Sequence, residues 1–203
     1  MRHDNTRLRE NAFIGMQAGA ADGWAPWCVR TLEKYDAVHY REALAAGLTP
    51  TPYETLVGAG NIVMNGGADL MWERLITEAP STSSTGVVSQ AFSSGNMSLQ
   101  VGNSTATSGT RTHNTLQATT DNRFAAASSV FTHTSGTSTA ARTLTVTAAF
   151  TSSEANVNWA EWGVRNTISV LTTVGRLLNR KVEDLGTKTS AGVWTLTLNL
   201  TLS

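Results

Sequence analysis

Residues 193–203 read VWTLTLNLTLS, and from Trp194 onward apolar and polar side chains alternate strictly. In an extended chain, successive side chains point to opposite faces. One face of this stretch carries Trp194, Leu196, Leu198, Leu200 and Leu202, and the other carries Thr195, Thr197, Asn199 and Thr201. A strand of this kind at a free edge would promote aggregation, because no Lys or Pro blunts it. We therefore expect its apolar face to pack on a facing sheet, and its edge to be paired within the sheet or with a neighbouring subunit.

The same period-two alternation recurs earlier in the chain. Met97, Leu99 and Val101 alternate with polar residues, and residues 143–150 alternate between Thr and apolar side chains. Weaker strand candidates are residues 124–133, 159–164 and 174–182. Short strands separated by Ser, Thr, Gly and Asn turns are typical of an antiparallel β-sandwich or jelly-roll-like domain. The chain is therefore predicted to be mainly β.

The first quarter of the chain has a different composition, rich in charged residues. We expect residues 1–54 to form a partly helical N-terminal arm, irregular to about residue 26 and then helical through Val29, Leu32, Val38 and Leu44. Gly47 and two nearby prolines would end that helix. Residues 55–203 would form the β-rich domain, with one helix near residues 68–76.

Composition excludes several classes of partner. The net charge is 0, the pI is about 6.9 and only 15% of residues are charged, whereas phosphate binding needs clustered Lys and Arg. We therefore expect no direct nucleic-acid partner and no polybasic membrane attachment. No apolar stretch reaches the roughly 20 residues that cross a bilayer, and the first residues lack a signal-peptide core. The single cysteine, Cys28, excludes an internal disulfide and indicates assembly in the cytosol.

No motif in the sequence indicates a cofactor, a metal or a catalytic site. The Gly58-x-Gly60 pair lacks the third glycine of a dinucleotide fingerprint, so a turn before a helix is the better interpretation. The four histidines, at positions 3, 39, 113 and 133, have no metal-ligand spacing. Cys28 has no evident activator and is expected to be a small buried filler.

Two carboxylates, Glu154 and Glu161, could be imagined as a glycosidase pair flanking a sugar bond. The favoured alternative is structural, with Glu161 as a strand carboxylate that pairs with Arg165, Arg176 or Arg180. The tryptophans are expected to be core or interface anchors. The candidate anchors are Trp159, Trp162, Trp194, Leu196, Leu198 and Leu200.

The order of these segments resembles a recurrent kind of tailed-bacteriophage virion protein. The resemblance rests on NWAEWGVRN at 158–166, LLNRK at 177–181, GTKT at 186–189 and the terminal Trp-Thr-Leu-Thr-Leu strand, and covers about residues 55–203. It implies a non-enzymatic structural protein of the particle, assembled in the host cytoplasm. The favoured placement is the outer capsid surface, as a cement or decoration protein that forms trimers and bridges subunits of the major capsid protein.

Three alternatives remain open from the sequence. The first is a tail, baseplate or fibre component of the same particle. The second is a carbohydrate- or receptor-binding module that uses exposed Trp or Tyr side chains as stacking platforms. The third is a glycosidase that uses Glu154 and Glu161.

Overall fold

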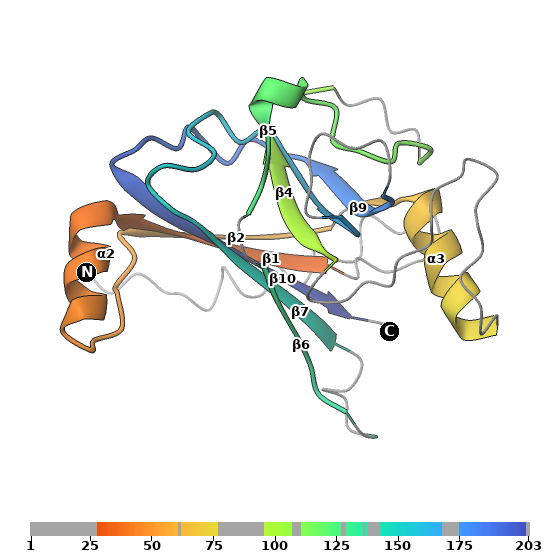
Figure 1. Cartoon of the computed structure of the whole chain (residues 1–203), viewed down its shortest axis with the longest axis horizontal. Helices are drawn as coiled ribbons and strands as arrows, with labels where there is room; N and C mark the ends of the chain where they lie inside the picture. Colours follow the sequence, from red (N-terminus) through yellow and green to blue (C-terminus); the bar gives the residue numbers. More distant parts are fainter. Residues whose placement is uncertain are drawn as a thin grey trace, which may run out of the picture.

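Two antiparallel five-stranded sheets pack face to face in this computed structural model, which describes residues 28–60, 62–76, 96–106, 111–126, 129–135, 137, 143–167 and 175–201 (Figure 1). Sheet A has the order β2 (Glu54–Ala59), β1 (Cys28–Asp36), β10 (Gly192–Thr201), β7 (Thr143–Phe150) and β6 (Ser129–His133). Sheet B has the order β3 (Ile62–Val63), β9 (Leu177–Val182), β8 (Glu161–Arg165), β4 (Ser98–Gly102) and β5 (Arg123–Ala125). The predicted mainly β sandwich is confirmed.

The terminal strand β10 lies at the centre of sheet A, as expected from its pattern. It pairs with β1 on one side and with β7 on the other, so that Leu198 faces Arg30 and Val146. Trp194, Leu196, Leu198 and Leu200 are all buried in the core. Leu202, the last member of the predicted apolar face, lies outside the described residues.

The core between the sheets is built around β10 and three aromatic rings. Phe150 packs edge-on against Trp159 at a centroid distance of 4.7 Å, and Trp159 packs edge-on against Trp194 at 4.9 Å. The Trp159 indole Nε1 donates to the Ala155 carbonyl oxygen at 2.9 Å. A buried indole N–H that keeps a partner adds no desolvation penalty, so the rings serve as apolar filling.

The predicted helix over residues 29–44 is wrong in its first half. Residues 28–36 form strand β1, and α2 (Ala37–Ala45) begins only after Asp36, whose Oδ1 accepts from the N–H groups of Val38 and His39. The alternate side chains Cys28, Arg30, Leu32 and Lys34 are all buried, which is a strand pattern. Two of the buried alternates, Arg30 and Lys34, are charged, so they hide the period-two pattern, and the spacing of Val29 and Leu32 resembles that of a helix.

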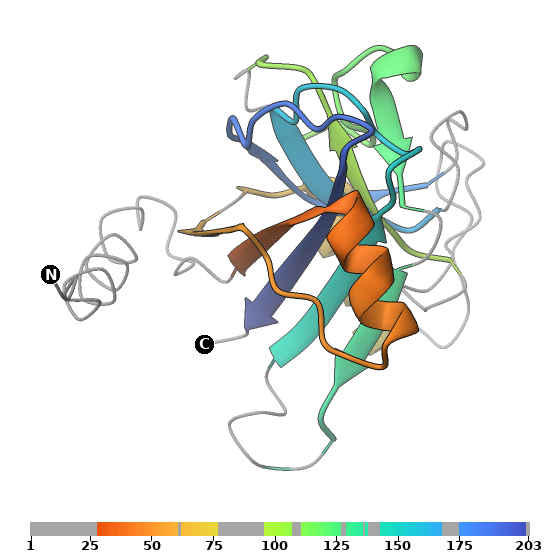
Figure 2. The same cartoon turned by 90° about the vertical axis from the view of Figure 1, so that its left-hand side faces the viewer.

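The predicted division at residue 54 also needs correction. Strand β1 pairs with β10 along its whole length and belongs to the sandwich, and α2 packs across the end of β1 and β10 (Figure 2). Residues 1–27 of the expected arm lie outside the described residues. Strand β2 was not expected from the sequence, and it includes Gly58, which was assigned to a turn. Of the two glycines in that predicted turn, only Gly60, with a φ of 81°, has a turn conformation.

The remaining predicted elements are present. Helix α3 (Asn65–Ile76) contains the helix expected near residues 68–76. Strands β4, β7, β8 and β9 fall on stretches that were expected to be strands. The single candidate at residues 124–133 is instead two strands, β5 in sheet B and β6 in sheet A. The 3₁₀ turn η2 (Thr120–Asn122) directly precedes β5.

Candidate interaction face

The outer face of sheet A is a broad polar surface that is nearly free of charge. We call it the threonine face, defined by the side chains that alternate with the buried ones on the five strands. Its members are Thr55, Val57 and Ala59 on β2; Val29, Thr31 and Glu33 on β1; Thr195, Thr197, Asn199 and Thr201 on β10; Thr143, Thr145, Thr147 and Ala149 on β7; and Val130 and Thr132 on β6. Glu33 is its one charged member.

Hydroxyl groups on this face pair with each other across β7 and β10. The side-chain oxygens of Thr143 and Thr201 lie 3.0 Å apart, and those of Thr147 and Thr197 lie 3.1 Å apart. Between them, the Thr145 hydroxyl donates to Asn199 Oδ1 at 2.8 Å. A polar group that keeps a hydrogen bond when water leaves costs little to bury. The threonine face can therefore be pressed against a neighbouring surface at small cost.

Apolar side chains stand at both ends of the central row of this face. The row runs Val57, Thr31, Thr197, Thr147, Val130 across all five strands. Val57 is 62% exposed and Val130 is 58% exposed, so both edges of the sheet carry an apolar residue in solvent. Single exposed valines are ordinary on a protein surface, so the paired hydroxyls and the low charge are what mark the threonine face as a candidate interaction surface.

The two candidate carboxylates are each held by local donors. Glu161 is fully buried: Oε2 accepts from Arg180 Nε at 2.7 Å and from the Gln117 N–H at 3.0 Å, and Oε1 accepts from the Ala118 N–H at 2.6 Å. Glu154 accepts from the N–H and the hydroxyl of Thr151 at 2.8 and 2.9 Å. The predicted arginine pairing of Glu161 is confirmed, with Arg180 as its partner.

The tryptophan anchors are core residues. Trp159 and Trp162 are fully buried and Trp194 is 3% exposed, so the expectation that they are core anchors is confirmed. They are not the exposed stacking platforms that the carbohydrate-binding alternative requires. Alternation placed Trp194 correctly, whereas the inward position of Trp159 depends on the loop before β8. Of the other tryptophans, Trp24 and Trp27 lie outside the described residues, and the side chain of Trp72 is not described.

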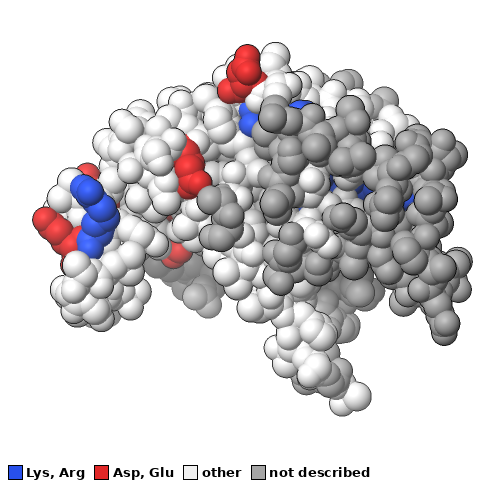
Figure 3. Space-filling model, in the orientation of Figure 1, with Lys and Arg blue, Asp and Glu red and all other residues white. Residues whose placement is uncertain are grey.

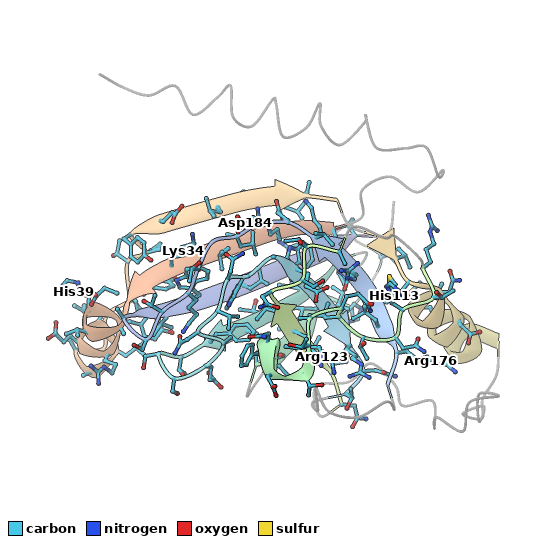
Figure 4. All side chains as sticks on the ribbon, turned by 90° about the horizontal axis from the view of Figure 1, so that it is seen from above. Lys34, His39, His113, Arg123, Arg176 and Asp184 are labelled. Atoms are coloured by element: carbon cyan, nitrogen blue, oxygen red, sulfur yellow. The ribbon has the colours of Figure 1, made fainter. Side chains whose placement is uncertain are left out.

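Cys28 is a buried filler, as predicted. It is fully buried on β1, and burial raises the pKa of its thiol to about 12, which leaves it protonated and unreactive. His39 on α2 and His113 beside α3 lie at opposite ends of the molecule (Figure 4). Within the described ranges, no three His, Cys, Asp or Glu side chains are grouped to hold a metal ion. None of the described helices is long and apolar enough to cross a membrane.

Charged side chains are sparse on the surface that faces the viewer in Figure 3. Acidic and basic groups gather over α2, and the rest of the described surface there is largely uncharged (Figure 3). Several charged residues are instead buried, among them Arg30, Lys34, Arg165, Arg176, Arg180, Glu161 and Lys188. This interior role is not evident from the sequence, because a buried arginine and an exposed one have the same local sequence pattern.

Comparisons of this chain with protein-family models, with curated proteins and with solved structures returned no significant match.

Proposed function

We propose that this chain is a non-enzymatic structural protein of a tailed-bacteriophage particle, and that it works through the threonine face. On this proposal the protein acts as a capsid cement on the outer surface of the shell. Its partners are the major capsid protein and other copies of itself. The particle itself is proposed from the sequence resemblance over residues 55–203, and the mode of action from the surface.

The observation that carries the mode of action is the chemistry of the threonine face. Its hydroxyls are already paired at Thr143–Thr201, Thr145–Asn199 and Thr147–Thr197, and one carboxylate, Glu33, is its only charge. A cement protein must stay bound in a range of salt conditions, and an uncharged contact loses little affinity to ionic screening. A specific interface buries about 800 Å² per partner, which is the order of area that one five-stranded sheet offers.

The environment of the candidate acid pair favours this role over a hydrolase. Glu161 is enclosed by Arg180 and two backbone N–H groups, and a general acid must instead reach a substrate oxygen. The buried tryptophans likewise favour a structural role over a sugar-binding one. The tail or baseplate remains the alternative placement within the particle.

The copy number of this chain per purified particle tests the proposal. Quantitative mass spectrometry would compare it with the most abundant shell protein. A ratio near one, or a simple fraction of one, is expected for a cement protein on the lattice. A handful of copies would move the chain to the tail or baseplate, and its absence from particles would overturn the structural role.

A further inference from the structure

Strand β2 is an open sheet edge without the usual protection. Within the described residues, no strand lies beyond β2 in sheet A. Natural edge strands are blunted by Lys, Pro, bulges or shortness, yet β2 has six residues, contains neither Lys nor Pro, and carries the exposed Val57. The edges of sheet B are much shorter, at two residues for β3 and three for β5.

The hydrogen-bond pattern shows which backbone groups of β2 point outward. Gly60 N–H donates to the Cys28 carbonyl at 2.9 Å, so in an antiparallel ladder Gly58 and Leu56 also face β1. Thr55, Val57 and Ala59 therefore direct their N–H and C=O groups to the open edge. The Ala59 carbonyl fits this assignment, because it accepts from the side chain of Lys181 on sheet B, Nζ to O 2.6 Å.

Most of the exposed large apolar side chains among the described residues lie on β2, on α2 or on the segment that joins them. Five of the six are found there: Val38, Leu44, Leu48, Tyr53 and Val57. The single charge on β2 is Glu54 at its start, which pairs with Lys34 Nζ at 2.9 Å. An uncharged extended strand therefore fits this edge better than a charged one.

A second copy of β2 meets this requirement in one register. If a two-fold axis passes through Val57, the antiparallel partner places Val57 opposite Val57 and Thr55 opposite Ala59. Each of these is a pair of outward-pointing residues, which can exchange two backbone hydrogen bonds. Glu54 then faces Gly60 of the second copy, so no like charges meet, and the carbonyl of Ala59 has a second lone pair for the new bond.

We propose that β2 is the docking edge for a second copy of this chain, paired antiparallel about Val57. Two sheets A then join into one continuous sheet, and the two threonine faces become one wider face. The inference rests on the proposed function only for the expectation that the chain self-associates. The inference specifies which strand mediates the self-association, that the two strands run antiparallel, and which residues lie opposite one another.

The opposite edge, β6, offers the competing arrangement. Val130 is exposed there as well, and pairing β2 of one copy with β6 of the next would be head-to-tail. Such a contact closes only as a ring and otherwise grows into a fibre. The two-fold pairing uses the same β2 residues on both copies and stops at two, so it gives a dimer in place of the trimer that the resemblance implied. This closure favours it for a protein that must stay soluble before assembly.

Cysteine cross-linking of the full chain tests the register. Directly opposed residues of a hydrogen-bonded antiparallel pair have Cα atoms about 5.5 Å apart, which is within disulfide reach. Val57→Cys should therefore form a disulfide-linked dimer on mild oxidation. Thr55→Cys alone should not, whereas a mixture of Thr55→Cys and Ala59→Cys chains should. The native Cys28 is buried with a pKa of about 12 and does not compete.

The cross-linking results decide whether β2 is the strand that docks a second copy of the chain. A Val57→Cys dimer, together with the mixed Thr55–Ala59 product, supports the register. A cross-link between Val57→Cys and Val130→Cys chains, without the Val57 dimer, would replace it by head-to-tail pairing. If light scattering finds an oligomer and Val57→Cys does not cross-link, the edge is wrong while the proposed function stands. A protein that is monomeric at all concentrations overturns the inference. The proposed function is tested independently by the copy number of the chain per particle.

Discussion

Arg30 and Glu183 form a two-point ion pair that ties sheet A to sheet B. Arg30 Nε and Nη2 donate to the two carboxylate oxygens of Glu183 at 2.8 and 2.7 Å, and the third nitrogen, Nη1, donates to the Leu56 carbonyl at 2.9 Å. Gly58 leaves room for the guanidinium, because a Cβ there would lie 2.8 Å from Arg30 Nη2. One arginine thus connects β1 and β2 of sheet A to the chain just after β9 of sheet B.

Glu183→Gln should destabilise the protein by about 2 kcal/mol, because it leaves the buried Arg30 without its counter-charge. Urea unfolding followed by tryptophan fluorescence measures this change in the free energy of unfolding. The control is Glu54→Gln, which removes the half-exposed partner of Lys34 and should cost no more than about 1 kcal/mol. Equal effects of the two changes would show that Arg30–Glu183 is no stronger than a surface pair.

Leu198→Asp should abolish folding, whereas Thr197→Asp should leave the fold intact. The two residues are neighbours on β10 that point to opposite faces, Leu198 into the core and Thr197 onto the threonine face. A carboxylate buried without a partner costs several kcal/mol. Circular dichroism and soluble yield of the two variants check this prediction. A folded Leu198→Asp protein would mean that the faces of β10 are assigned wrongly.

Lys188 should make stability rise with pH between about pH 8 and 10. Its buried ammonium donates to the carbonyls of Thr151 and Glu154 and to Asn156 Oδ1, and burial lowers its pKa from 10.5 to about 8. In that window the unfolded chain binds more protons than the folded one, so raising the pH favours the folded state. Two other groups oppose this trend at higher pH, because each keeps its proton in the folded protein after the unfolded chain has lost it. The Cys28 thiol, whose pKa burial raises from 9.0 to about 12, does so from about pH 9, and Tyr35, whose pKa burial raises from 10.0 to about 12, does so from about pH 10.

Lys188→Met isolates this contribution. The difference in unfolding free energy between Lys188→Met and the unchanged protein, measured from pH 7.5 to 10, should vary with pH only through Lys188. A difference that stays constant across the window would contradict the lowered pKa.

Glu161→Gln should act on stability and not on catalysis. The change leaves Arg180 buried without its counter-charge and should cost about 3 kcal/mol. The Glu154→Gln, Glu161→Gln double variant should behave like the unchanged protein toward host envelope polysaccharide, with no release of reducing sugar from either. Sugar release that the double variant loses would restore the glycosidase alternative.

Period-two alternation was sufficient to predict the strands in which every buried alternate is apolar. Strand β10 is the clearest case, from Trp194 to Leu200, and β7 follows it. It failed at β1, where two of the buried alternates, Arg30 and Lys34, are charged and are satisfied by Glu183 and Glu54 from distant segments. Such pairs follow from tertiary contacts, so local pattern cannot reveal them.

The candidate face could be predicted only in part. The hydroxylated side of β10 was evident in the sequence, but its extension over β1, β2 and β6 depends on strand order. Strand β2 was missed because Gly58 was assigned to a turn, whereas it lies within the strand and leaves room for the Arg30 guanidinium, a tertiary contact that the local pattern does not reveal.

The most direct test of the account is whether the threonine face holds this chain on a particle. Particles that lack the chain would be incubated with Thr197→Asp protein, and with Ser190→Asp protein as a control at an exposed turn outside the face. Bound copies per particle would be counted by quantitative mass spectrometry. The account predicts loss of Thr197→Asp binding and full binding of Ser190→Asp, with both proteins folded. Full binding of Thr197→Asp would contradict it.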